Sequence, residues 1–419
     1  MDNTERLRVL ELYSGIGGMH YALNESSVPA EVVAAVDVNT TANEIYKHNF
    51  PSTPLLPKTI EGMTLQDFDK LNFDVILMSP PCQPFTRIGL QGDVADPRTK
   101  SFLYILELLP RLSKRPSFIL LENVKGFETS AARDALLKTL RECDYSFQEF
   151  LISPTSLGIP NSRLRYFLIA RRPPGSFSFP ISILEGFPMS ESSNSLTVPH
   201  NHPTSSECER EKTGTIIFKL ETEEELERKR IQDSQETVRR LQDFLQEDEE
   251  GMDQYLLPPK TLLRYALLMD IVQPSSRRSV CFTKGYGHYV EGTGSVLQSC
   301  VDVELEGVFK SLELLSEEDK LKQLSQLKLR YFTPREIASL MGFPADFTFP
   351  KHISIKQQYR VLGNSLNVHV VSQLLHHLEF ELISSHSFTR LVRVCLSFPC
   401  CNSLYNSVNI LCFNVKILT

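Results

Sequence analysis

The chain lacks long apolar runs. Across its 419 residues, no apolar stretch approaches the roughly 18 residues that a bilayer-spanning helix needs, so we expect no membrane partner. The N-terminus, 1–6, is polar and leads straight into an apolar segment, and we expect no secretory signal there. No internal repeat is visible. These absences leave an ordinary globular protein, 41% hydrophobic and 23% charged, long enough for two domains.

Paired cysteine spacing is also missing. The nine cysteines show no regular spacing, and four of them (Cys395, Cys400, Cys401 and Cys412) fall within the last 25 positions. This usage is typical of a reducing compartment and argues against a disulfide scaffold, so we expect a cytoplasmic protein. No Cys/His set has zinc-ligand spacing. His200, His202 and Cys208 lie close together in a polar stretch, but we expect no metal site.

The net charge of −7 is concentrated in one segment. Residues 221–250 carry 12 acidic and 5 basic side chains, so the other 389 residues hold 39 of each sign. A basic face elsewhere is therefore compatible with the acidic total, and a nucleic-acid partner is not excluded.

The first 170 residues alternate strand and helix signals, which predicts a doubly wound α/β sheet. The expected strands are 7–12, 32–36, 74–78, 118–121 and 166–170, and the expected helices are 40–48, 100–112 and 131–143.

The later chain changes in composition. Residues 176–215 are rich in Ser, Pro, Asn and Thr, which predicts a mobile linker or loop. Residues 221–250 predict a solvated surface helix with sparse apolar positions at Leu226, Val238, Leu241 and Leu245. A helix beginning at Leu366 is expected to pack on the first domain. The tail 380–419 holds only four charged side chains and no clean period, and we expect no chemistry from it.

Cys82 lies in a proline-rich loop, 79–85, directly after the apolar run 73–78. If that run is a buried strand, the thiol sits at the carboxyl edge of the sheet, where ligands bind in open α/β folds. Three prolines in seven residues restrict the loop. A nucleophile and a small buried hydrophobe are equally good interpretations of the loop alone.

A glycine turn follows the first strand. Residues 13–18 include Gly15, Gly17 and Gly18, and Asp37 follows the second strand. Glycines allow a close approach of ligand to backbone at a helix start, and a carboxylate at Asp37 can accept hydrogen bonds from both ribose hydroxyls. The pattern fits an adenosine-containing cofactor, NAD included, although it departs from Gly-x-Gly-x-x-Gly. A plain structural turn is the alternative.

Two further groups end strands at the same edge. Glu122 follows 118–121, as either a proton-sharing acid or a helix cap. Arg163 and Arg165 precede the strand 166–170, and alternation points them the same way, where they can lower a thiol pKa or hold an anionic or carbonyl group. Together with a thiol these groups suit attack on C6 of a pyrimidine, followed by methylation at C5 of a base taken out of its stack.

At this point the chain resembles the cytosine-5 methyltransferase family, which uses S-adenosylmethionine. The resemblance covers about 1–379. The motifs that carry it, in family order, are 13–18, 79–85, 122–124, Asn161-x-Arg163-x-Arg165, 330–336 with 342–344, and 363–366.

The resemblance implies a Rossmann-like sheet with a smaller target-recognition domain: a catalytic domain 1–175 completed by 355–379, a recognition domain 176–354, and the atypical tail 380–419. It implies Cys82 as nucleophile, Glu122 as base-binding acid, and Arg163 and Arg165 as assisting groups. Two positions depart from the family pattern, Val38 for an aromatic residue and Thr59 for an acid. The implied cofactor-binding residues are Tyr13, Ser14, Gly15, Ile16, Gly17, Gly18, Asp37, Val38, Thr59, Ile60, Asn364 and Ser365.

Within the family the chain is most similar to the small eukaryotic branch that acts on tRNA, through 255–260 and 281–286. This implies methylation of cytosine 38 in the anticodon loop of aspartate tRNA, by a monomer in the cytoplasm with a further pool in the nucleus. DNA is a second, weaker partner. A DNA cytosine-5 methyltransferase and a non-catalytic RNA-binding relative remain the alternatives. Cys281 lies near the expected site, and a structural role is favoured for it.

Overall fold

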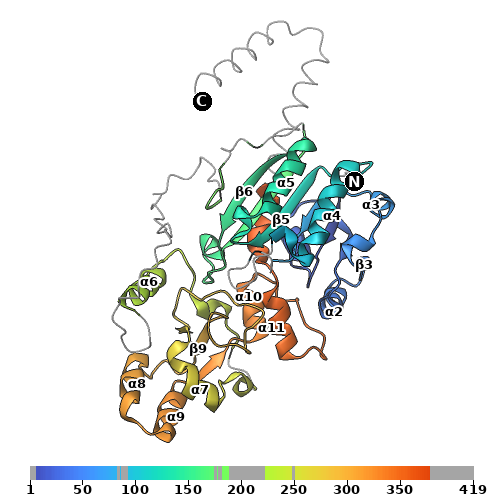
Figure 1. Cartoon of the computed structure of the whole chain (residues 1–419). Coiled ribbons are helices and arrows are strands. Elements are labelled where there is room, and N and C mark those ends of the chain that lie inside the picture. The colour runs from blue at the N-terminus through green and yellow to red at the C-terminus, as the bar shows by residue number, and fades with distance from the viewer. Residues whose placement is uncertain are drawn as a thin grey trace, which may run out of the picture.

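The structure is a computed structural model, and it describes residues 6–82, 85, 93–173, 177, 182–187, 222–247 and 251–377. A large sheet with its helices forms one part of the molecule, and a smaller sheet with short helices forms the other (Figure 1). No helix within these ranges has the length and apolar character needed to cross a membrane.

The large sheet has seven strands in the order β3-β2-β1-β4-β5-β7-β6. Its strands run parallel except β7, which is antiparallel to both neighbours. This is the predicted α/β fold, and all five expected strands are present. Two further strands, β3 and β6, were missed. The bounds are β1 (Leu7–Leu12), β2 (Ala30–Val36), β3 (Leu55–Leu56), β4 (Val75–Met78), β5 (Phe118–Val124), β6 (Ser146–Ile152) and β7 (Arg165–Arg171).

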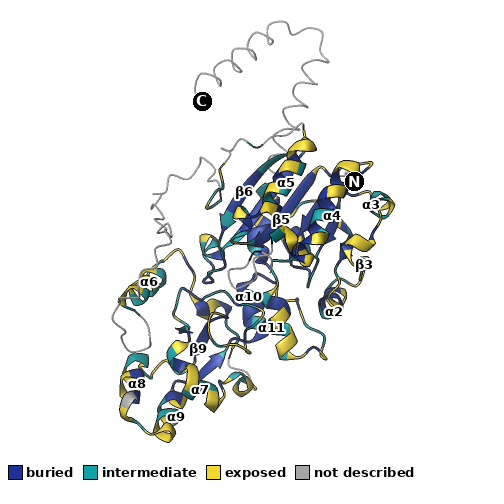
Figure 2. Ribbon diagram, in the orientation of Figure 1, coloured by how far each residue is buried: buried dark blue, intermediate teal, exposed yellow. Residues whose placement is uncertain are grey.

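Alternate residues of the central strands pack into two separate apolar clusters. In β5, Leu120 belongs to one cluster, while Ile119 and Leu121 belong to the other. Because successive side chains of a strand point to opposite faces, both faces of the sheet are covered. The strands are accordingly buried along most of their length (Figure 2). Burial on both faces explains why these strands are continuous apolar runs in the sequence.

Helices cover the sheet at positions that local capping explains. The side chains of Asn39 and Ser130 accept hydrogen bonds at the starts of α2 and α5, from the amides of Ala42 and Arg133. The expected helix 100–112 stops earlier, because the chain tightens into a 3-10 turn at Leu109–Arg111 that contains Pro110. The helix bounds in this part are α1 (Gly18–Glu25), α2 (Thr40–Asn49), α3 (Leu65–Leu71), α4 (Lys100–Leu108) and α5 (Ala131–Glu142).

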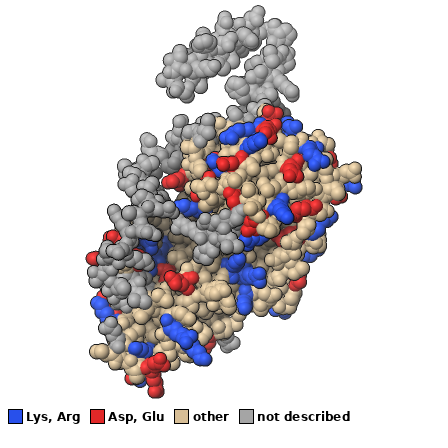
Figure 3. Space-filling view, viewed as in Figure 1, with Lys and Arg blue, Asp and Glu red and all other residues tan. Residues whose placement is uncertain are grey.

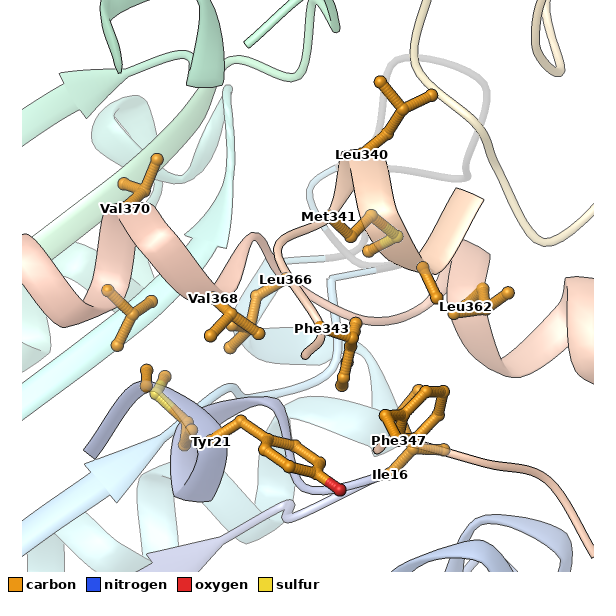
Figure 4. Packing of buried hydrophobic residues seen from close by; sticks show 14 of the residues in the cluster. Ile16, Tyr21, Leu340, Met341, Phe343, Phe347, Leu362, Leu366, Val368 and Val370 are labelled. Carbon is orange, nitrogen blue, oxygen red and sulfur yellow. The ribbon is translucent and has the colours of Figure 1, made fainter. Parts of the chain in front are cut away.

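The C-terminal part of the described chain returns to the large sheet. It contains α10 (Pro334–Leu340), α11 (Ile355–Gly363) and a helix over 368–377. Phe343 and Phe347 pack edge-on against Tyr21 of α1, with ring centroids 5.7 and 5.8 Å from it (Figure 4). The last helix begins two residues later than expected, because Asn367 caps it by accepting a hydrogen bond from the amide of Val370.

The smaller sheet has the order β10-β9-β8 and its own apolar core. Leu262, Phe309 and Leu324 supply side chains to that core from three different helices. The bounds are β8 (Ile271–Val272), β9 (Val296–Gln298), β10 (Leu329–Tyr331), α7 (Pro259–Tyr265), α8 (Leu305–Ser311) and α9 (Glu317–Gln326).

The prediction of one solvated helix over 221–250 is wrong for its second half. The helix α6 spans Glu223–Asp233 and buries no residue, as expected of a surface helix. Beyond it, Val238 and Leu241 are 2% and 0% exposed, and the amide of Leu241 bonds to the backbone oxygen of Ser276. These apolar side chains are too sparse to make a helix face, and they instead anchor an irregular segment in the core.

Several predictions fall on segments outside the described residues. These are most of the linker 176–215, including His200, His202 and Cys208, and the tail 380–419. A described piece of the linker, 182–187, lies along β6, where the amide of Leu184 donates to Glu149 and its oxygen accepts from Leu151.

Candidate active site

The loop that carries Cys82 is tied to the carboxyl ends of β1 and β5, the two strands that flank β4. The hydroxyl of Ser79 donates to the backbone oxygen of Tyr13 at 3.2 Å, and the side-chain amide of Asn123 donates to that of Pro80 at 3.2 Å. A third bond runs from the amide of Phe85 to the oxygen of Cys82. The sulfur is therefore held at the carboxyl edge of β4, as its place in the sequence predicted. Residues 83 and 84 lie outside the described chain.

Glu122 and Arg165 meet at the same edge. Because β7 is antiparallel to β5, its first residue, Arg165, pairs with Val124 at the carboxyl end of β5. The Nε atom of Arg165 lies 3.5 Å from Oε1 of Glu122, and both side chains are largely buried. Glu122 lies within β5 rather than after it, so its interpretation as a helix cap is wrong.

Arg163 lies deeper and ties several segments together. Its Nη1 atom donates to the backbone oxygen of Phe282 at 2.9 Å, and its Nη2 atom donates to the oxygens of Gly363 and Ser365. The side chain is buried, with the residue 4% exposed. Satisfied backbone acceptors around a buried guanidinium make this arginine a structural clamp for the site.

Both guanidiniums contact the sulfur of Cys281, at 3.2 Å from Nη1 of Arg163 and 3.7 Å from Nη2 of Arg165. Burial raises the pKa of Cys281, but the two arginines outweigh it and lower the pKa overall. Sequence reasoning favoured a purely structural role for this cysteine. Its contacts with both arginines show that it belongs to the polar network of the site.

The electrostatics of Cys82 differ from those of Cys281. Burial raises the pKa of the Cys82 thiol, and the charge of Glu122 raises it further against the opposing effect of Arg165 and Arg163. Burial also raises the pKa of Glu122, again against the two arginines. Burial thus raises the pKa of both the thiol and the acid, and the two arginines oppose that rise in each case.

The glycine turn has a backbone that only glycine adopts readily. Gly15 and Gly17 have φ of 53° and 87°, and a Cβ at Gly17 would lie 2.5 Å from Cε2 of Phe50, so this glycine also allows close packing within the protein. Asp37 closes the turn from β2 by accepting hydrogen bonds from the amides of Gly15 at 2.9 Å and Asn39 at 2.8 Å. The Oγ atom of Ser14 is buried without a hydrogen-bond partner in the described part of the chain. Buried polar atoms in proteins nearly always have a hydrogen-bond partner, and a bound ligand would supply one for this hydroxyl.

The remaining predicted cofactor residues surround this turn unequally. Ser365 is close, because a Cβ at Gly18 would lie 3.2 Å from its Oγ atom. Val38 is 61% exposed beyond the end of β2, where an apolar side chain can cover a ring. Ile60 is buried, whereas Thr59 before it is exposed. Tyr13 has a positive φ, and its hydroxyl donates a hydrogen bond to the hydroxyl of Ser101. Ile16 packs in the apolar core, and Asn364 is the residue at which α11 ends.

Two features of the site escaped the sequence interpretation. Asn123 was predicted only as part of the motif 122–124, without a role of its own, yet its side-chain amide fixes the Cys82 loop. Gly363 approaches the chain at 283–284 so closely that a Cβ would lie 2.2 Å from the amide nitrogen of Lys284. In the sequence, the glycine directly before Asn364 was the only sign of this close contact.

Among the described residues, no group of three or more His, Cys, Asp or Glu side chains could hold a metal ion.

Comparisons with known proteins match the part of the chain that contains these site residues. The profile of the family described as C-5 cytosine-specific DNA methylase matches residues 7–379. Two relatives named tRNA (cytosine(38)-C(5))-methyltransferase, from Homo sapiens and Bos taurus, are 61% and 60% identical, over 88% of this chain and 98% of theirs. The solved structure of a Spodoptera frugiperda DNMT2 mutant is 40% identical with a TM-score of 0.69, covering 88% of this chain and 98% of that one.

Proposed function

This chain belongs to the family of C-5 cytosine-specific DNA methylases, and on that premise we propose that it methylates C5 of cytosine 38 in the anticodon loop of aspartate tRNA. We propose S-adenosylmethionine as methyl donor and an adduct between Cys82 and C6 as intermediate. The observation that carries the proposal is the convergence of Cys82, Glu122 and Arg165 at one sheet edge, with Glu122 and Arg165 3.5 Å apart.

Glu122 and the arginines prepare the base. Burial raises the pKa of Glu122, which favours its protonated form more than in an exposed carboxyl, and a proton held there can be shared with N3 of cytosine. Electron density is thereby drawn toward N3, and C6 becomes electrophilic. Arg165, beside Glu122, can donate to the carbonyl oxygen of the same ring.

Cys82 then supplies the nucleophile. Its sulfur gives its proton to a solvent water and forms a bond to C6, and the electrons of the C5–C6 double bond make C5 nucleophilic. S-adenosylmethionine, when bound, would supply the electrophilic methyl group for C5, its sulfur departing as the neutral thioether. A solvent water takes the C5 proton, which restores the double bond as the C6–sulfur bond breaks, and Cys82 leaves with the bonding electrons. The tied loop keeps the sulfur in place throughout these steps.

The residues around the glycine turn fit that donor. The buried Oγ atom of Ser14 has an unused donor, suited to a carboxylate such as that of the methionine group. Asp37 is half-buried, and each of its oxygens has one backbone donor and so a lone pair left for a ribose hydroxyl. Ser365 adjoins Gly18 and would close the pocket from the C-terminal side.

The choice of tRNA rests on the printed names of the relatives and on the cost of flipping a base. An anticodon loop presents unpaired bases, so taking one from its stack costs less than in a duplex. Basic side chains gather near the middle of the face shown in Figure 3, between the two parts of the molecule, which suits a phosphate backbone despite the acidic total. Duplex DNA is the second candidate, favoured by the description of the family.

Incubation of the full chain with methyl-labelled S-adenosylmethionine tests the proposal. We expect label in C5 of cytosine 38 of aspartate tRNA and little in duplex DNA at equal nucleotide concentration. Label confined to duplex DNA would replace the proposal with the second candidate. No label in any nucleic acid, with tRNA still bound, would favour a non-catalytic RNA-binding relative.

We also propose the organisation of the chain and its location. Residues 1–175 with 355–379 form the catalytic unit, a grouping supported by the bonds of Arg163 to Gly363 and Ser365. Residues 176–354 form the recognition unit, whose end, with Phe343 and Phe347, packs on Tyr21 of the catalytic unit. The protein acts as a monomer in the cytoplasm, with a nuclear pool. Light scattering of the purified chain and imaging of a tagged chain check the two statements.

A further inference from the structure

A short loop following Cys281 is held rigidly by its own hydrogen bonds. The amide of Thr283 donates to the backbone oxygen of Thr293 at 2.9 Å and so closes the loop. Inside it, the amide of Tyr289 donates to the oxygen of Gly285 at 2.9 Å, and the hydroxyl of Thr293 donates to the oxygen of Tyr289 at 2.7 Å. The backbone on both sides of Tyr289 is therefore fixed.

Tyr286 anchors this loop to the rest of the molecule. Its hydroxyl donates to the oxygen of Ser295 at 2.7 Å and accepts from the amide of Phe332 at 2.9 Å. Its ring packs edge-on against Phe282 and Tyr359, each with the centroid 5.0 Å away. A fully enclosed aromatic anchor makes the loop a preformed surface.

Tyr289 is the opposite of Tyr286 in exposure. It is 64% exposed, although it sits on a fixed backbone. Its Cδ2 atom lies over Gly285, 3.0 Å from the position that a Cβ would take there, and its ring centroid is 4.6 Å from that of His288. A side chain at position 285 would push the ring away, so the glycine helps to hold the ring where it is.

The ring lies close to the polar network of the active site. Gly285 is four residues from Cys281, a separation that an extended chain covers in at most about 14 Å. Cys281 in turn contacts Arg163, and the amide of Lys284 approaches Gly363 in the same network. The loop that carries Tyr289 therefore adjoins the network through both Cys281 and Lys284.

The charges of the loop favour a base over a phosphate. Lys284 and Glu291 are both exposed, so the loop has no net attraction for a polyanion. An aromatic face stacks on any nucleobase regardless of that balance.

We propose that Tyr289 is a stacking platform for a nucleobase immediately beside the target cytosine of the anticodon loop. The proposal rests on the proposed function and adds the part of the substrate that this loop contacts. Stacking holds the neighbouring nucleotide while the cytosine enters the site, so Tyr289 contributes to selection of an unstacked loop over a duplex.

Methylation rates of tRNA by full-length variants test the proposal. We expect Tyr289→Ala to lower kcat/KM by roughly 5- to 100-fold, and Tyr289→Phe, which keeps the ring, to stay within about twofold of the parent. Tyr265→Ala removes another exposed tyrosine, at the end of α7, and should leave kcat/KM unchanged. Affinity for S-adenosylmethionine and the thermal midpoint should be unaffected by Tyr289→Ala.

A substrate-side change makes the test specific. Hairpins with an abasic nucleotide immediately before or after cytosine 38 are compared with the intact hairpin. With the parent protein, one of the two abasic hairpins should lower kcat/KM as much as Tyr289→Ala lowers it with the intact hairpin. With Tyr289→Ala, that same abasic hairpin should cause no further loss of kcat/KM. If the abasic hairpins lower kcat/KM equally in the parent and in Tyr289→Ala, or if Tyr289→Ala keeps the parental kcat/KM, Tyr289 is not a stacking platform. The proposed tRNA methylation would be unaffected by either result. A parent that labels only duplex DNA would overturn the proposed function, and the platform with it.

Discussion

The Nη2 atom of Arg163 lies 3.2 Å from the backbone oxygen of Gly363, although 200 positions separate the two residues. The same guanidinium bonds to Phe282 and Ser365, so one buried cation links the end of the large sheet, the segment after Val280 and the turn after α11. The site is assembled from distant parts of the chain by this clamp.

Replacement of that clamp should cost stability as well as activity. Lysine at position 163 keeps the charge but cannot donate to several acceptors in the fixed geometry of a guanidinium. We expect Arg163→Lys to lose about 2–4 kcal/mol of unfolding free energy, measured by urea denaturation. Arg165→Lys is the matched control and should lose less unfolding free energy. Within the described part of the chain, Arg165 donates to one backbone oxygen, that of Leu164. An unchanged midpoint for Arg163→Lys would contradict the clamp.

The acid at position 122 should affect the chemical step. Glutamine can accept a hydrogen bond but cannot share a proton with N3, so Glu122→Gln should lower the single-turnover rate by roughly 10²- to 10⁴-fold. Glu128 follows the end of β5 and accepts a bond from the amide of Gly126, so Glu128→Gln provides a control that should keep the parental rate. A parental rate in Glu122→Gln would remove this acid from the mechanism.

Asp37 should govern the cofactor rather than the RNA. Its carboxylate orders the glycine turn and has lone pairs free for a ribose. We expect Asp37→Ala to weaken S-adenosylmethionine binding by about 10- to 100-fold in calorimetry, the loss of one or two charge-assisted hydrogen bonds. Binding of tRNA should change little. Equal losses for both ligands would indicate a collapsed site instead of a lost contact.

A buried acid under the glycine turn predicts a pH dependence of stability. Burial raises the pKa of Glu11 to about 8, and its carboxylate accepts a bond from Tyr46 at 2.8 Å. The folded protein thus keeps a proton that the unfolded chain releases above its ordinary pKa of 4.5. The contribution of Glu11 to stability should fall as pH rises from there to about 8, by up to ~1.4 kcal/mol per unit.

Glu11→Gln tests this dependence, since the amide oxygen still accepts from Tyr46 but cannot ionise. Urea unfolding at pH 5.5, 6.5 and 7.5 should show a smaller loss of unfolding free energy between pH 6.5 and 7.5 than in the parent, and between 5.5 and 6.5 a gain that the parent lacks. Burial lowers the pKa of nearby His20 to about 4, so stability is lost separately as pH falls from 6.5 toward 4, in both proteins. Identical slopes above pH 5.5 would contradict a protonated Glu11.

The sequence predicted strand ends better than side-chain partners. Buried parallel strands are continuous apolar runs, so Cys82, Asp37 and Glu122 could be assigned to one edge. The bonds of Arg163 depend on packing between segments far apart in the chain, and no local pattern encodes them. The segment around Leu241 was misassigned because its few apolar residues contact the core without any helical period.

RNA carrying 5-fluorocytosine at position 38 tests the central claim most directly, because fluorine cannot leave C5 as a proton does and the adduct is trapped. With S-adenosylmethionine, the parent should form a denaturation-resistant protein–RNA complex, and peptide mapping should place the RNA on Cys82. Cys82→Ala should form none and should transfer no label to ordinary tRNA. A trapped complex with Cys82→Ala, or undiminished methylation by it, would contradict the account.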